Sequence, residues 1–132
     1  MDYIKEGTDD RLFAIAQLIR LGVDLSLIWN ATKIDMFFLE KFRNIVAFEP
    51  VLRAGKNDVD TLRAAKRRGF SDKYIAQCWQ ISENDVWKMR EANDIFPVYK
   101  MIDTCASEFD SYIPYFYSTY ETENESVVTP RK

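Results

Sequence analysis

One order of glycine, helix-capping and apolar residues occurs twice in this 132-residue chain, at an offset of 47 residues. Gly22 in the first copy corresponds to Gly69 in the second. The further pairs are Asp24 with Ser71, Ile28 with Ile75, Ala31 with Cys78, Ile34 with Ile81, Asp35 with Ser82, Leu39 with Val86, Phe42 with Met89 and Arg43 with Arg90. Because duplication of a helix-turn-helix unit would produce such a repeated pattern, the sequence predicts two stacked helical units.

The first copy opens with two short helices. The first helix should begin near Thr8 or Asp9, because either side chain can accept hydrogen bonds from the N–H groups of the first turn. It should end at Gly22, since glycine adopts the left-handed conformation that closes a helix. Asp24 can then cap a second helix that runs to Ala31. A tight connection between the two helices is therefore expected.

A longer third helix is predicted over residues 36–46, capped by Asp35 and apolar over a wide face. Pro50 is expected just beyond its end, because a proline inside a helix removes a hydrogen bond and clashes with the preceding turn. Residues 54–58 have the composition of a loop. The second set of helices should follow this loop.

The composition changes after Asn93. Residues 95–102 are β-branched and aromatic, and five of the seven tyrosines lie between Tyr99 and Tyr120. We expect a partly irregular aromatic segment here, followed by a polar linker over residues 122–132. So many amphipathic rings indicate either docking onto a partner or a tail that completes the core of its own helices, and the sequence leaves both open.

Charge and composition argue against several functions. The net charge is −3, which disfavours nucleic acid and anionic lipid as partners. The chain has no histidine, only isolated glycines, and two distant cysteines, Cys78 and Cys105. We therefore expect no catalytic residue, no cofactor site and no metal site in it, and both thiols should be buried. No leader and no membrane span are expected either, since no apolar run approaches about 20 residues.

Residues 70–90 have the layout of a DNA-reading helix-turn-helix, with Ser82 capping the would-be recognition helix. That helix would place Glu83 and Asp85 in its first turn, where they would repel phosphates. A structural role is therefore favoured, and a small DNA-binding regulator is kept as the competing hypothesis.

The chain has one basic cluster, which comprises Arg63, Lys66, Arg67 and Arg68. Such side chains can bind phosphate or a carboxylate partner. They also lie in the last turns before Gly69, where cations stabilise a helix by about 0.3–1 kcal/mol each through its dipole. The second interpretation is favoured.

Candidate interface residues lie in two places. On the third helix, the adjacent Met36, Phe37 and Phe38 cannot all point inward. In the second copy and the aromatic segment, the candidates are Trp87, Tyr112, Tyr115, Tyr117 and Tyr120, because exposed aromatic side chains favour interfaces.

Two motifs of the aromatic segment resemble a known family. Residues 96–109, Phe-Pro-Val-Tyr-Lys-Met-Ile-Asp-Thr-Cys-Ala-Ser-Glu-Phe, and residues 114–121, Pro-Tyr-Phe-Tyr-Ser-Thr-Tyr-Glu, resemble the end of the oligomerisation domain of carbamoyl-phosphate synthetase large chains. Upstream, residues 11–13, 32–35, 38–39 and 68–72 resemble the same domain in the same order. The resemblance therefore covers nearly the whole chain.

The resemblance implies an all-α fold, with two stacked helix-turn-helix-like units and the aromatic segment, over residues 1–121. Residues 122–132 would lead to the second of two ATP-grasp halves that flank the domain. The implied role is a non-catalytic scaffold and subunit-association domain. It implies flanking synthetase halves, a glutaminase small chain and further copies of the chain as partners, and the cytoplasm as location.

The implied parent enzyme is a ligase, the glutamine-hydrolysing carbamoyl-phosphate synthase. It uses ATP with Mg²⁺ or Mn²⁺ to make carbamoyl phosphate from bicarbonate and glutamine-derived ammonia, for arginine and pyrimidine synthesis. An effector-binding module is a third hypothesis, ranked last because effectors of the family bind a separate C-terminal domain.

Overall fold

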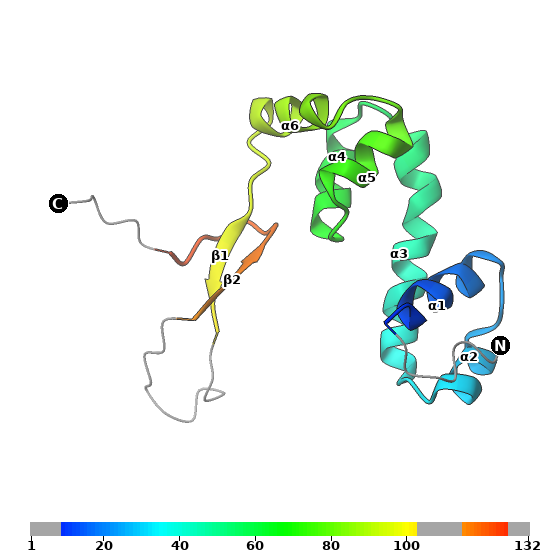
Figure 1. The fold of residues 1–132 in the computed structure, drawn as a ribbon. Helices are drawn as coiled ribbons and strands as arrows, with labels where there is room; N and C mark the ends of the chain where they lie inside the picture. The colour runs from blue at the N-terminus through cyan, green and yellow to red at the C-terminus, as the bar shows by residue number, and fades with distance from the viewer. Residues whose placement is uncertain (1–8, 103–114, 127–132) are drawn as a thin grey trace. The chain divides into compact units, whose positions relative to one another are not determined.

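The computed structural model describes residues 9–102 and 115–126, and these residues are predominantly α-helical. Helices form first along the chain and a two-stranded sheet follows them (Figure 1). The predicted all-α fold class is confirmed. The chain divides into two compact units, Met1–Ala54 and Gly55–Lys132, hereafter unit 1 and unit 2. Each unit holds one copy of the sequence repeat, whereas the stacking of the units stays a prediction.

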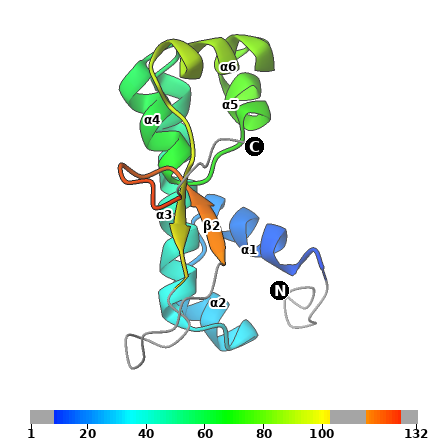
Figure 2. The same cartoon turned by 90° about the vertical axis from the view of Figure 1, so that its left-hand side faces the viewer.

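Unit 1 consists of α1 (Arg11–Arg20), α2 (Leu25–Thr32) and α3 (Met36–Ala54). Both short helices pack against α3, as the two views in Figure 1 and Figure 2 show. Ile15, Ile28 and Leu39, one from each helix, are fully buried and form the centre of the core. Partly buried apolar side chains of all three helices, among them Leu18, Leu25 and Met36, pack around this centre.

The helices of unit 2 are α4 (Val59–Arg67), α5 (Asp72–Trp79) and α6 (Glu83–Ala92). Helices α5 and α6 pack on each other. The fully buried side chains Leu62, Ile75 and Val86 stand at the repeat positions of the three central residues of unit 1. The buried positions of the first copy are therefore also buried in the second.

The glycines end equivalent helices in the two units by the same hydrogen bonds. Gly22 and Gly69 both have positive φ angles, 77° and 86°. The Val23 N–H donates to the Leu18 carbonyl at 3.0 Å, and the equivalent bond after Gly69 measures 3.1 Å. This is the Schellman arrangement, which requires a left-handed residue next to the helix end. The predicted role of both glycines is confirmed.

The predicted capping residues also cap their helices. Asp24 and Asp35 accept from backbone N–H groups of α2 and α3, and Ser71 and Ser82 do the same for α5 and α6. In addition, α2 and α5 both end at a left-handed residue with φ 55°, Lys33 in unit 1 and Gln80 in unit 2. These two positions are also 47 residues apart, a correspondence that the alignment of glycines and caps did not use.

Two boundaries differ from the prediction. Helix α1 begins at Arg11 after Asp10, whose side chain makes no capping bond, so Asp9 is not the cap and Thr8 lies outside the described residues. Helix α3 continues through Pro50 to Ala54, so the prediction that Pro50 lies beyond it was wrong.

Packing explains why α3 tolerates Pro50. A proline inside a helix costs about 3 kcal/mol, whereas burial of Phe48 and Leu52 in the same turns contributes roughly 1.5–3 kcal/mol each. Glu49, also buried, accepts three hydrogen bonds from the Arg20 guanidinium at 2.6, 2.9 and 3.2 Å. The burial of these side chains and the Arg20–Glu49 bonds therefore outweigh the local penalty.

The aromatic segment, predicted to be partly irregular, contains an antiparallel pair of strands, β1 (Val98–Met101) and β2 (Phe116–Thr119). The outer edge of β1 is covered by residues that follow β2. The Tyr99 N–H donates to the Asn124 side chain at 3.1 Å, and the Glu125 N–H donates to the Tyr99 carbonyl at 2.9 Å. Asn124 and Glu125 belong to the predicted linker over residues 122–132, and the boundary of that linker stays a prediction.

Cys78 is a free thiol and is half-buried, so the prediction that it is buried was wrong, while Cys105 lies outside the described residues. Cys78 lies near the end of the amphipathic helix α5, which explains its partial exposure.

Within residues 9–102 and 115–126, none of the helices is both long and apolar enough to cross a bilayer.

Candidate functional site

An exposed apolar stripe runs along α3 of unit 1. Phe37 and Phe38 are 58% and 56% exposed, and Ile45, two turns further along, is also exposed. Met36, by contrast, packs against the core of unit 1. The adjacency of the three residues predicted that they could not all point inward, and here two of them point outward. Their role as an interface stays a prediction.

The stripe is held in place by its own contacts. The rings of Phe37 and Phe38 meet edge to face with centroids 5.5 Å apart, and the Lys41 Nζ lies 5.0 Å from the Phe37 ring centroid. The helical backbone and these ring contacts restrict the rotamers of both side chains. Such rings lose less side-chain entropy on binding a partner than freely rotating rings would. Other exposed apolar side chains of unit 1 are Leu12, Phe13, Leu21, Leu27, Trp29 and Val51.

The candidates of unit 2 have different surroundings. Trp87 is partly exposed on α6 and meets the Phe96 ring edge to face at 6.0 Å. Tyr115 and Tyr117 are exposed next to and on β2, as a docking surface requires. Tyr120 points instead toward the helices of its own unit, and Tyr112 lies outside the described residues. Tyr120 therefore packs on its own helices, whereas docking of the aromatic segment onto a partner stays a prediction.

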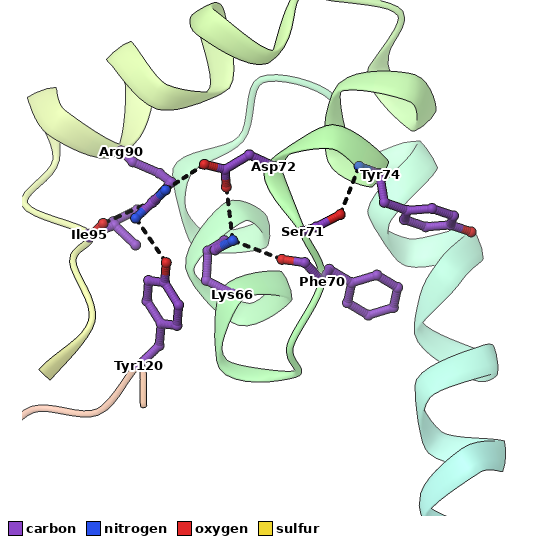
Figure 3. Close-up of polar contacts among 8 residues, drawn as sticks. All are labelled: Lys66, Phe70, Ser71, Asp72, Tyr74, Arg90, Ile95 and Tyr120. Carbon is purple, nitrogen blue, oxygen red and sulfur yellow. Dashed lines mark hydrogen bonds and ion pairs between the residues drawn. The ribbon is translucent and has the colours of Figure 1, made fainter. Parts of the chain in front are cut away.

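Tyr120 is part of a buried ionic cluster that comprises Lys66, Asp72, Arg90 and Tyr120 (Figure 3). The Lys66 Nζ donates to the Asp72 carboxylate at 2.8 Å, and the Arg90 guanidinium donates to the other oxygen of that carboxylate. Arg90 also donates to the Tyr120 hydroxyl at 2.9 Å. The cluster thus joins α4, α5, α6 and the segment after β2.

The cluster excludes most solvent. The side chains of Lys66, Asp72 and Arg90 are 7%, 15% and 6% exposed. Lys66 donates to the Phe70 carbonyl at 2.9 Å and Arg90 to the Ile95 carbonyl at 3.2 Å, and both cations lie 5.0–5.4 Å from the Tyr120 ring centroid. One carboxylate balances two cations, so carbonyl oxygens and the π face of the ring supply the remaining compensation.

Sequence reasoning missed this cluster. It assigned Lys66 to the helix dipole and did not single out Asp72, because each charge lies where a helix end favours it. A signal was present in the repeat, since Lys66 and Asp72 stand where the first copy has Ile19 and Leu25. Opposite charges at two positions that are apolar in the other copy indicate a buried pair.

The predicted basic cluster is dispersed in the structure. Lys66 points into the ionic cluster, and Arg68 donates to the Ala64 carbonyl at 3.1 Å near the end of α4, where a cation opposes the helix dipole. Arg63 donates to the Asn93 carbonyl at 3.1 Å, and Arg67 lies beside it at the edge of a cavity. The four side chains therefore do not form one phosphate-binding patch.

The geometry of α6 disfavours the DNA-reading hypothesis. Ser82 and Asp85 form a reciprocal capping box at the start of α6, and the hydrogen bond from the Ser82 side chain holds the pKa of Asp85 below its ordinary value. Glu83 is acidic and exposed in the same turn, whereas Arg90 is buried. The surface that would face phosphates is thus negatively charged at its first turn.

Within the described ranges, no three side chains of His, Cys, Asp or Glu gather as a metal site would require.

The comparison with protein families adds independent information. Residues 1–94 match the model of the carbamoyl-phosphate synthetase large chain, oligomerisation domain. The match spans α1 to α6 and ends before β1, so it covers both copies of the repeat. The chain therefore belongs to the family of carbamoyl-phosphate synthetase large chain oligomerisation domains.

Proposed function

We propose that this chain is a non-catalytic scaffold and subunit-association domain of a glutamine-hydrolysing carbamoyl-phosphate synthase, a cytoplasmic ligase. The parent enzyme would use ATP with Mg²⁺ or Mn²⁺ to make carbamoyl phosphate from bicarbonate and glutamine-derived ammonia, for arginine and pyrimidine synthesis. The domain, residues 1–121, would lie between two ATP-grasp halves and hold no cofactor itself. A glutaminase small chain would complete the enzyme.

The observation that carries the association role is the exposed stripe on α3. Phe37 and Phe38 are more than half exposed although they lie on an ordered helix. A partner that covers such apolar area stabilises the complex by about 25 cal/mol for each Å² removed from water. Large aromatic side chains are also frequent among the residues that dominate binding energy. We take a second copy of the chain as the partner of the stripe.

A second surface supports the scaffold role. Tyr115, Phe116 and Tyr117 are exposed around β2, while Tyr120 anchors the same segment to α6. The strand pair would pack on a flanking synthetase half, with ring faces buried and hydroxyl groups bonded at the boundary. Separate surfaces would thus serve association of copies and contact within one chain.

Sedimentation equilibrium of the chain over a hundredfold concentration range, compared with the variant Phe37→Asp, tests the association role. The charge should weaken self-association by at least about tenfold, since it cannot be buried unpaired, and helicity by circular dichroism should remain. The matched control is Ala47→Asp, which adds the same charge at an exposed position on another side of α3. Equal effects of the two variants, or a monomer at every concentration, would contradict the proposal.

A further inference from the structure

One cavity of unit 2 lies where four segments of the chain meet. Its volume is about 280 Å³, close to the lower end of the range for small-molecule sites, roughly 300–1,000 Å³. Helix α4, the turn after α6, strand β1 and the segment after β2 all contribute to its lining. The Arg90 guanidinium donates to the hydroxyl of Tyr120 in this lining at 2.9 Å, so the buried ionic cluster holds that wall in place (Figure 3).

The lining carries as many positive as negative side chains. Arg63 and Arg67, one turn apart on α4, are its cations, and Asp94 and Glu121 are its anions. The Lys100 ammonium lies 3.1 Å from Glu121 and is shared with a further carboxylate outside the lining, so this second pair adds no net charge. The cavity is therefore neutral as a whole and disfavours a ligand that carries a net charge.

Two of these charges, Arg67 and Asp94, are not compensated by residues that the structure describes. Neither side chain forms a hydrogen bond or an ion pair there, although both are exposed and line the same cavity. Arg63 donates to the Asn93 carbonyl at 3.1 Å, which uses one of the five N–H donors of its guanidinium and leaves its charge unpaired. The cavity thus keeps opposite charges apart, and a ligand with both signs can bridge them.

Part of the lining is apolar. Ile95 is 3% exposed, and Phe96 and Val98 contribute to the same lining. The Phe96 ring meets the Trp87 ring edge to face, which restricts its rotamers. A ligand of this cavity therefore gains from an apolar group in addition to its two charges.

We propose that this cavity binds a free α-amino acid with an aliphatic side chain. The carboxylate and ammonium groups of such a ligand are both ionised near neutral pH, so the ligand is neutral overall, as the lining is. Arg67, with Arg63 one turn away, binds the carboxylate through its guanidinium fork, and Asp94 binds the ammonium group. The aliphatic side chain packs against Ile95. This site is independent of the proposed scaffold role, since no residue of the α3 stripe takes part in it.

Calorimetric titration of the whole 132-residue chain with leucine near neutral pH tests this site. Two analogues provide the comparison: isocaproate is leucine without its ammonium group, and isoamylamine is leucine without its carboxylate. Leucine should bind saturably, and each analogue at least about tenfold more weakly, because the analogue leaves one charge of the cavity without a partner. Absence of saturable leucine binding, or an analogue that binds as tightly as leucine, overturns the proposal.

A pair of variants tests the carboxylate side of the site. Arg67→Gln removes the guanidinium fork and should weaken leucine binding by about tenfold or more. The matched control Arg68→Gln removes the same charge from the next residue, which lies outside the lining and bonds to the Ala64 carbonyl. This control should change the affinity by less than about twofold. Equal losses in the two variants would show that only the overall charge of the chain matters, and the site would be refuted.

The ammonium side is tested by a variant whose effects on two ligands are opposite in sign. Asp94→Asn removes the carboxylate, and asparagine tolerates the left-handed φ of 53° at this position. Leucine binding should weaken by about tenfold, whereas isocaproate binding should strengthen by about threefold, because a repelling charge is gone. Loss of folding would weaken both ligands, so opposite changes exclude it. Changes of the same sign for both ligands, or no change, overturn the proposal.

Discussion

The two helical units have the same backbone plan but different interiors. In unit 1, Ile19 and Leu25 pack against the core of Ile15, Ile28 and Leu39. The corresponding positions of unit 2 hold Lys66 and Asp72, which form a buried ion pair. A duplicated set of helix ends can thus enclose either an apolar cluster or a charged one.

Arginine residues at one repeat position show the same divergence. Arg43 of unit 1 is more than half exposed and lies 3.9 Å from Glu40, one turn away. Its counterpart Arg90 is almost fully buried and bonds to the Asp72 carboxylate and the Tyr120 hydroxyl. Unit 2 therefore uses this position to attach a segment that has no counterpart in unit 1, whose repeat copy ends within α3. The two units thus keep the same helix ends while their core side chains differ in charge.

Removing Asp72 should give the largest effect on this comparison. Asp72→Ala leaves Lys66 and Arg90 buried without a carboxylate, so we expect a loss of about 3–5 kcal/mol in the free energy of unfolding. Leu25→Ala, the equivalent truncation in unit 1, should cost less, because Leu25 is only partly buried. Urea unfolding followed by circular dichroism measures both. A smaller loss for Asp72→Ala than for Leu25→Ala would show that the ion pair contributes little.

Replacing the whole set of charges sharpens the same comparison. The triple variant Lys66→Ile, Asp72→Leu and Arg90→Leu gives unit 2 the apolar residues of unit 1 at two positions and removes the third charge. Replacement of buried ionic sets by apolar residues is often neutral or stabilising by about 1–4 kcal/mol. The triple variant should therefore recover most of the stability lost by Asp72→Ala. It should also free Tyr120, which hydrogen exchange of residues 116–119 would detect as faster exchange.

The glycine positions should respond equally, because the two units share their helix ends. A Cβ at Gly22 or at Gly69 would meet no other atom within 4 Å, so the cost of alanine comes from the positive φ alone. That cost is about 1–2 kcal/mol for each residue. Thermal unfolding of Gly22→Ala and Gly69→Ala should give matching losses. A difference of more than about 1 kcal/mol would show that one of the two Schellman turns is under additional constraint.

The smallest effect concerns the capping residues at the paired repeat positions, which are acidic in unit 1 (Asp24, Asp35) and neutral in unit 2 (Ser71, Ser82). Hydrogen bonds from the Ser26 side chain and backbone hold the pKa of Asp24 below its ordinary value. A lowered pKa in the folded state means that the cap stabilises α2 above the ordinary carboxyl range and is lost as the pH falls through the lowered pKa. Asp24→Ser, which copies Ser71, should keep the cap and reduce the loss of melting temperature below about pH 4. An unchanged pH profile would contradict this assignment.

Local features of the fold were predictable because they depend on residues that are close in sequence. A glycine at a helix end and an Asp or Ser two residues later satisfy backbone groups within a single turn, whatever the rest of the chain does. The helix ends at Gly22 and Gly69 and the caps Asp24, Ser71 and Ser82 were therefore correct. Residues 8–10, where three polar side chains follow one another, did not specify which one begins α1.

The remaining features depend on residues that are distant in sequence. Pro50 stays inside α3 because Glu49 meets Arg20 and because Phe48 and Leu52 are buried, none of which a local pattern contains. The strands β1 and β2 pair although 14 residues separate Met101 from Phe116 in the printed sequence.

By itself, the sequence determined the duplicated helical plan, the helix-ending glycines, the caps and the family. The tertiary structure decided which charged residues are buried and which aromatic residues are exposed. The physical reason is that a charge enters a core when partners from several elements compensate it, as Asp72 and the ring of Tyr120 do for Lys66. Sequence spacing describes the elements one at a time, whereas compensation exists only once they have packed.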